Sequence, residues 1–172
     1  MNAFLLMIPL FLIRFGLLGL LNRAALARAA HFAPREGREQ TAYLVYQLSN
    51  ALLIVYPLFL RIRTGSPWFW PGLVLYLLGM AVLAAATAAF ARPGETGLNT
   101  AGLYRLSRNP MYVGYFVYFL GCAALARSWV LLLALLVFQV SAHWIILSEE
   151  RWCLQRFGGE YAAYMARVRR YL

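Results

Sequence analysis

The sequence predicts an all-α integral membrane protein with five transmembrane helices, a C-terminal helical hairpin and an amphipathic cytoplasmic tail helix. Three observations support this fold class. Of the 172 residues, 63% are hydrophobic and the mean hydropathy is +0.64, whereas soluble domains are roughly half apolar. The apolar residues gather in runs of about 17 to 25, a length that crosses the hydrocarbon core as a helix. All 16 basic residues are arginine and, apart from Arg14, they fall between these runs.

Five segments fit the length of a membrane span. They comprise residues 4–21, 43–60, 73–90, 111–126 and 129–147. The fourth segment is short, and only Arg127-Ser128 joins it to the fifth. These two segments are therefore predicted to form a helical hairpin. Its first helix is the shortest of the five spans and the least able to reach the far surface of the membrane. We treat residues 1–172 as a single integral membrane domain, with three spans in residues 1–90 and the hairpin and tail in residues 91–172.

The arginines predict an orientation, because cytoplasmic loops retain positive charge. Twelve arginines lie in the first loop, the third loop and the tail, against three in the second and fourth loops. This asymmetry predicts an N-terminus outside and a C-terminus in the cytoplasm, which five spans allow. With a net charge of +10, the expected partners are anionic membrane lipids and an acidic ligand group. Nucleic acid is disfavoured, since no soluble segment gathers the arginines on one face.

A polar turn precedes the fourth span. Asparagine is a favoured N-cap and proline suits the first helical position, so Arg108-Asn109-Pro110 predicts a helix that begins at Met111. Its free N–H groups and positive dipole end would face a cytoplasmic pocket. A carboxylate or phosphate could bind there, with Arg105 or Arg108 as a bidentate clamp. The alternative interpretation is a well-capped helix with solvated arginines.

Polar residues also mark the fifth span and its end. Gln139, His143 and Glu150 share one helical face, while Glu149 points about 100° away. Polar groups at membrane depth usually face a cavity or the bundle interior. The two glutamates could stabilise a cationic ligand or orient a ribose. Hydrogen bonds between helices for Gln139 and His143, and pairing of the glutamates with Arg151, are the structural alternatives.

Two further features have a structural and a functional interpretation. Arg14 lies near the middle of the first span, where a charge costs several kcal/mol without a partner. We favour a structural role for it, and a place in a substrate cavity is the alternative. In the tail, a helical stripe of Tyr161, Tyr164, Val168 and Tyr171 is expected to lie on an anionic leaflet, with a lid over the pocket as the alternative.

The two cysteines of the chain, Cys122 and Cys153, are isolated in the sequence. They have no spacing typical of a metal site or a disulfide framework. We therefore expect no metal site in this protein.

Short motifs between residues 90 and 170 occur in a recognisable order. They are Gly102-Leu103-Tyr104-Arg105, Arg108-Asn109-Pro110-Met111-Tyr112-Val113-Gly114, Glu149-Glu150, Phe157-Gly158 and Glu160-Tyr161-Ala162-Ala163-Tyr164. Together they resemble the integral-membrane methyltransferases of the isoprenylcysteine carboxyl methyltransferase and phospholipid N-methyltransferase superfamily. The first ninety residues match only as generic spans.

The resemblance implies a five-helix bundle with a cytoplasmic pocket for S-adenosylmethionine. A tunnel would lead from it to the bilayer, where a lipophilic small molecule or lipid is the methyl acceptor, such as an isoprenylcysteine carboxylate or a phospholipid amine. The cofactor-binding residues carried over by analogy are Gly102, Tyr104, Arg105, Arg108, Asn109, Pro110, Met111, Tyr112, Glu149 and Glu150.

One position departs from the pattern of these methyltransferases, which often have histidine between the arginine and the proline. Asn109 stands there, and an asparagine cannot titrate near neutral pH. The expected catalytic residues are therefore Arg108, which could hold a carboxylate acceptor, and Glu150 or His143, which could take a proton from an amine.

Two other functions fit the sequence less well. The first is an NADPH-dependent membrane sterol or enone reductase of related architecture, but Met111-Tyr112-Val113-Gly114-Tyr115 lacks the glutamate that we associate with those enzymes. The second is a non-catalytic lipid-binding membrane scaffold.

Overall fold

The computed structural model describes residues 1–30, 33–34 and 37–172, and every regular element in this part of the chain is helical. The first helical segment changes its hydrogen-bond pattern along its length. It consists of η1 (Ala3–Leu6), α1 (Met7–Phe11), the π-helical η2 (Leu12–Leu17) and α2 (Leu18–Leu21). This segment is followed by a short helix, α3 (Arg23–Ala30). Arg35, one of the arginines assigned to the first loop, lies outside the described residues.

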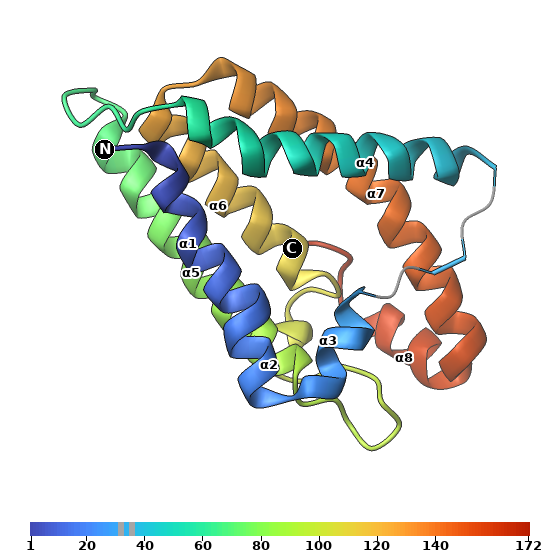
Figure 1. Ribbon diagram of the computed structural model, residues 1–172. Helices are drawn as coiled ribbons and strands as arrows, with labels where there is room; N and C mark the ends of the chain where they lie inside the picture. The colour runs from blue at the N-terminus through green and yellow to red at the C-terminus, as the bar shows by residue number, and fades with distance from the viewer. Residues whose placement is uncertain (31–32, 35–36) are drawn as a thin grey trace.

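The helices α4 (Arg38–Val55) and α7 (Trp129–Phe157) run along each other (Figure 1). A short 3-10 turn, η3 (Tyr56–Phe59), continues α4. The rings of Tyr46 and Phe138 stack between the two helices at a centroid distance of 4.9 Å. At the N-terminal end of α4, Arg151 of α7 donates to both carboxylate oxygens of Glu39 at 2.7 Å.

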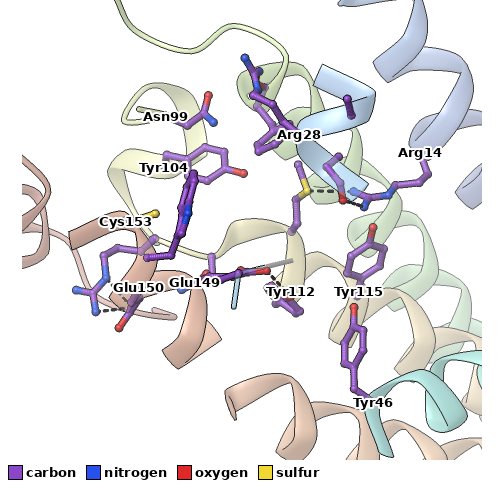
Figure 2. Close-up of a pocket in the computed structure, with 18 of the residues that line it drawn as sticks. Arg14, Arg28, Tyr46, Asn99, Tyr104, Tyr112, Tyr115, Glu149, Glu150 and Cys153 are labelled. Atoms are coloured by element: carbon purple, nitrogen blue, oxygen red, sulfur yellow. Dashed lines mark hydrogen bonds and ion pairs between the residues drawn. The ribbon is translucent and has the colours of Figure 1, made fainter. Parts of the chain in front are cut away.

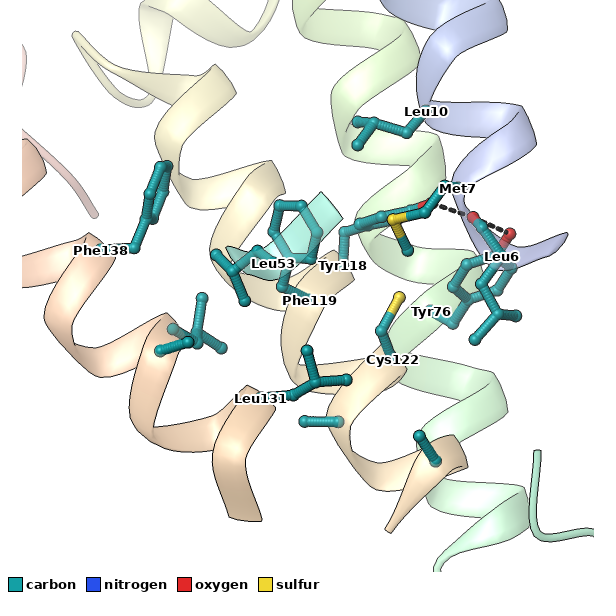
Figure 3. Packing of buried hydrophobic residues seen from close by; sticks show 14 of the residues in the cluster. Leu6, Met7, Leu10, Leu53, Tyr76, Tyr118, Phe119, Cys122, Leu131 and Phe138 are labelled. Carbon is teal, nitrogen blue, oxygen red and sulfur yellow. Dashed lines mark hydrogen bonds between the residues drawn. The ribbon is translucent and has the colours of Figure 1, made fainter. Parts of the chain in front are cut away.

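The closest helix pair is α5 (Phe69–Phe90) with α6 (Pro110–Ala126). Gly79 lies against the backbone of Tyr118, and Gly121 lies against the backbone of Tyr76. A side chain at either glycine would collide with the facing helix, so small residues permit this approach. The Tyr76 and Tyr118 hydroxyls both donate to the Leu6 carbonyl, which fastens the first helix to this pair (Figure 3).

The remaining short elements lie toward one end of the bundle (Figure 1). They are α3, the 3-10 turn η4 (Gly102–Arg105) and α8 (Gly159–Arg167). The C-terminus lies close to the beginning of α6 in Figure 1, and Ser107 forms an isolated parallel bridge with Arg169. The tail thus returns to the turn before α6.

The predicted all-α membrane fold is confirmed. In the described part of the chain, four helical segments are long and apolar enough to cross a membrane: Ala3–Leu21, Arg38–Phe59, Phe69–Phe90 and Trp129–Phe157. The remaining apolar helix, α6, has 17 residues, or about 25 Å at 1.5 Å per residue. It is therefore shorter than a hydrocarbon core of about 30 Å, as the sequence predicts.

One predicted boundary is wrong. The apolar run was expected to end its helix near Glu149-Glu150, whereas α7 continues to Phe157. No glycine or proline interrupts residues 148–157, and Gly158 ends the helix with a positive φ of 52°. The two glutamates are therefore held on a rigid helix and not in a loop.

Candidate active site

A large cavity lies between the first helical segment, α4, α6, α7 and α8. Its volume is about 990 Å³, at the upper end of the range for small-molecule sites. One part is apolar and aromatic, with Leu10, Phe11, Ile54, Phe119 and Phe138 in its wall. The other part contains a cluster of polar groups, which are Asn99, Tyr104, Arg108, Asn109, Glu149 and Glu150. The cavity can therefore take a polar molecule and an apolar one side by side.

A buried ion-pair network forms one wall of the polar part. Arg108 donates to Oε1 of Glu150 from Nε at 3.0 Å and from Nη2 at 2.8 Å. Arg170 donates to Oε2 of the same carboxylate from Nη2 at 2.8 Å and from Nε at 3.1 Å. Hydrogen bonding to Glu150 raises the pKa of Arg170 above its usual value. Both oxygens of Glu150 are thus already used by arginine.

The same network holds the C-terminal segment. Nη1 of Arg108 donates to the carbonyls of Met165 at 3.1 Å and Val168 at 2.7 Å. The backbone N–H of Arg108 donates to the Arg169 carbonyl at 2.9 Å. The Asn109 amide donates from Nδ2 to the Arg170 carbonyl at 3.0 Å. The turn before α6 therefore recognises the tail mainly through its backbone.

Glu149 is in a different position from Glu150. Its Oε1 lies 3.5 Å from the Tyr112 hydroxyl, and among the described residues no arginine or histidine nitrogen reaches it within 4.0 Å. Figure 2 shows Glu149 and Tyr112 together in the cavity wall, apart from the Glu150 ion pair. Glu149 is thus the carboxylate that remains available to a ligand.

The segment before α6 supplies further polar groups. Oδ1 of Asn99 is buried and accepts no hydrogen bond within the described structure, and Asn99 lines the cavity. The Tyr164 hydroxyl donates to the Tyr104 carbonyl at 2.6 Å. Burial raises the pKa of Tyr104 well above its usual value and that of Tyr164 to about 12, so both hydroxyls are protonated at neutral pH. An acceptor without a donor and protonated hydroxyls can bind polar parts of a ligand.

This combination of an apolar bundle, a cavity with two unlike parts and a polar turn at the start of α6 agrees with a comparison against family models. The model for phospholipid methyltransferase matches residues 60–160. The chain belongs to the phospholipid methyltransferase family. None of the curated proteins and none of the solved structures compared with the chain matches it significantly.

Seven of the ten residues carried over as cofactor-binding line the cavity of this phospholipid methyltransferase family member. They are Tyr104, Arg108, Asn109, Met111, Tyr112, Glu149 and Glu150. Gly102, Arg105 and Pro110 are not among the lining residues. Gly102 has a positive φ of 58°, and Arg105 is exposed. These three shape the turn around the cavity and do not form its wall.

His143, a candidate catalytic residue, does not line the cavity. Its Nδ1 lies 2.8 Å from the Tyr171 hydroxyl. Gln139, on the same helical face, has a buried Oε1 without a partner in the described structure and is also absent from the cavity wall. Of the three residues predicted on this face, only Glu150 lines the cavity.

Two details of the predicted helix start and tail differ in the structure. Asn109 occupies the N-cap position, but its side chain makes no capping hydrogen bond and binds the Arg170 carbonyl instead. The tail helix ends at Arg167, and Tyr161 and Tyr164 pack inward against Leu98. Both tyrosines line the cavity, which agrees with the alternative that the tail covers the pocket.

The cavity also contains residues that the motifs did not indicate. Among them are Asn99, Tyr46 and Tyr115. Tyr46 is buried in α4, outside every motif, and no pattern in the sequence distinguishes it from the other tyrosines. Tyr115 follows the polar turn by one helical turn and a half, so the helical periodicity of α6 could have indicated it.

Proposed function

We propose that this protein is an S-adenosylmethionine-dependent methyltransferase that modifies a lipophilic acceptor taken from the bilayer. The observation that carries the proposal is that one cavity has both a polar part around Glu149 and an apolar part between the membrane helices. Methyltransferases of this family generally use S-adenosylmethionine. A water-soluble cofactor and a lipid-soluble acceptor could meet where the two parts of the cavity join.

The residues of the polar part fit such a cofactor. The Glu149 carboxylate has no cationic partner in the described structure and suits a positively charged sulfur or an amino group. Oδ1 of Asn99 is a buried acceptor in need of a donor, such as a ribose hydroxyl or an amine. The rings of Phe157 and Tyr161 line the same part of the cavity and offer faces on which an adenine could stack.

When bound, S-adenosylmethionine supplies a methyl group on a positively charged sulfur, and an acceptor atom takes it while the carbon–sulfur electron pair stays on sulfur. The protein has to align the acceptor and exclude water. The aromatic and aliphatic wall formed by α4, α6 and α7 does both for an apolar acceptor.

An amine acceptor would also have to lose a proton. Glu149 is the better proton acceptor, because Glu150 is neutralised by two arginines and His143 lies outside the cavity wall. A carboxylate acceptor would require no base. We therefore assign the proposed acid–base role to Glu149 in place of Glu150 and His143.

The arginine count supports a cytoplasmic location for the polar part. Arg108, Arg156 and Arg170 lie around this part of the protein, and the cytoplasmic side of a membrane protein is the arginine-rich one. We accordingly propose that the cofactor reaches the cavity from the cytoplasm and the acceptor from the membrane.

Binding and transfer are tested separately. Calorimetric titration of the purified protein in detergent with S-adenosylmethionine and S-adenosylhomocysteine should give saturable binding, and NADPH should give none. Transfer of a labelled methyl group into a host lipid extract then tests catalysis, and mass spectrometry of the labelled lipid identifies the acceptor. Absence of binding of both sulfur compounds, or tighter binding of NADPH, would contradict the proposal.

A further inference from the structure

Arg14 is a cation at membrane depth that lies outside the matched residues 60–160. It belongs to the π-helical segment η2, near the middle of the span Ala3–Leu21. A charged side chain at this depth is costly and usually marks a functional group or a paired one. π-helical turns inside helices are frequent at functional sites. The position of Arg14 therefore requires an explanation from its surroundings.

The Arg14 side chain faces the cavity. It forms part of the wall together with Leu10, Phe11 and Phe15 of the same helical segment. Figure 2 shows its guanidinium directed toward the interior, with Tyr115 between Arg14 and Tyr46. The cation thus lies at the apolar part of the cavity, whereas Glu149 belongs to the polar part.

The partners of Arg14 in the described structure do not neutralise its charge. Nη2 donates to the Ala29 carbonyl at 2.8 Å, and Nη1 lies 3.8 Å from the Met111 sulfur. No carboxylate of the described residues lies within 4.0 Å of it. A guanidinium has five N–H donors, so most of its donors remain available. Arg108, which also lines the cavity, instead donates four hydrogen bonds to Glu150 and the tail.

We propose that Arg14 binds an anionic group of the methyl acceptor, a carboxylate or a phosphate, inside the apolar part of the cavity. The planar fork of a guanidinium matches both groups. This inference rests on the proposed methyltransferase function and assigns the acceptor site to a helix that the family match does not include. Arg14 is a substrate-positioning residue in this arrangement, and Glu149 faces the cofactor.

Binding of simple amphiphiles tests the assignment without knowledge of the natural acceptor. The protein is placed in phosphatidylcholine nanodiscs with saturating S-adenosylhomocysteine, and retention of radiolabelled dodecanoate, dodecyl phosphate and dodecylamine is measured above that of empty discs. Dodecanoate and dodecyl phosphate distinguish a carboxylate from a phosphate as the recognised group. We expect saturable retention of at least one anion and no saturable retention of the amine.

The variant Arg14→Gln should weaken retention of that anion by about tenfold or more, as expected for loss of a charge-assisted hydrogen bond. Arg14→Lys keeps the charge but not the fork, so it should weaken retention less. The matched control is Arg28→Gln, since Arg28 also lines the cavity but is exposed, donates to the Phe90 carbonyl and lies over the Phe90 ring. This control should retain the anion as the wild type does.

Three results would overturn the proposal: equal anion retention by wild type and Arg14→Gln, an equal loss in Arg28→Gln, or saturable retention of the amine alone. Thermal unfolding of each variant identifies a folding defect. If Arg14→Gln has such a defect, anion retention is compared between the wild type and Arg14→Lys instead. Calorimetry with S-adenosylhomocysteine is carried out on the same preparations. Failure of the wild type to bind it would contradict the methyltransferase proposal, whereas loss of anion binding alone concerns Arg14.

Discussion

Arg108 and Glu150 form a buried ion pair across 42 residues of sequence. Their side chains are only 8% and 6% exposed. Arg170 binds the other oxygen of the same carboxylate from the tail, so Glu150 joins the turn before α6, the helix α7 and the C-terminal segment. Its neighbour Glu149 has no such partner among the described residues and lines the cavity. Two adjacent glutamates thus have different surroundings, and separate variants should have different effects.

Glu150→Gln should destabilise the protein. It removes one charge of a buried pair and leaves Arg108 without a counter-ion, a change that costs about 3–5 kcal/mol in other proteins. Thermal unfolding in detergent should show a clear fall in Tm, and limited proteolysis should cut the tail beyond Arg167 faster. Glu160→Gln is the control, because Glu160 is exposed and bonded only to Thr96 in the described structure. An unchanged Tm in Glu150→Gln would show that the network does not hold the tail.

Glu149→Gln should have the opposite pattern. Glutamine can still accept a hydrogen bond from Tyr112, so stability should remain close to that of the wild type. Methyl transfer into a lipid extract should fall by about a hundredfold, the effect expected when a positioned acid–base or charge-stabilising group is lost. Calorimetry on the same variant shows whether cofactor affinity falls as well. Full transfer activity in Glu149→Gln would remove this residue from the proposed mechanism.

Hydropathy and arginine placement were sufficient to predict the long apolar helices and the proximity of the polar turn to the two glutamates. A short connection at Arg127-Ser128 makes α6 and α7 antiparallel, so the start of one must lie beside the end of the other. The partner of each charge could not be predicted in the same way. Arg170 reaches Glu150 only because the tail folds back, and the amphipathic stripe of the tail is equally consistent with a membrane surface.

The rotation of α7 about its own axis could not be predicted from the sequence either. The 100° between Glu149 and Glu150 follows from helix geometry, but the choice of which carboxylate remains available depends on how α7 packs against α4 and α6. The rings of Tyr46, Phe119 and Phe138 form part of this packing. Their contacts join distant segments, so no local pattern encodes them.

His143→Gln tests the remaining sequence-based candidate for a base. Because His143 contacts Tyr171 and does not line the cavity, we expect methyl transfer to keep its pH dependence in this variant. Tyr171→Phe, which removes the hydroxyl from the same contact, should behave alike. A loss of one limb of the pH–rate profile in His143→Gln, but not in Tyr171→Phe, would restore His143 as a catalytic base.

The packing of α5 against α6 gives a prediction on stability. A Cβ at Gly79 would overlap the backbone of Tyr118, and one at Gly121 would overlap the backbone of Tyr76. Since two helix backbones cannot yield as a flexible side chain can, Gly79→Ala and Gly121→Ala should each cost about 1–3 kcal/mol of unfolding free energy.

The control for this prediction is Gly16→Ala, which adds the same methyl group where no described heavy atom beyond the chain neighbours and the backbone of the same helix lies within 4 Å. Alanine is a better helix former than glycine by about 1 kcal/mol, so Gly16→Ala should keep or raise the Tm in detergent. The two interface variants should lower it in the same measurement. Equal unfolding temperatures of Gly79→Ala, Gly121→Ala and Gly16→Ala would contradict the close approach of α5 and α6. The hydrogen bonds from the Tyr76 and Tyr118 hydroxyls to the Leu6 carbonyl depend on the same approach.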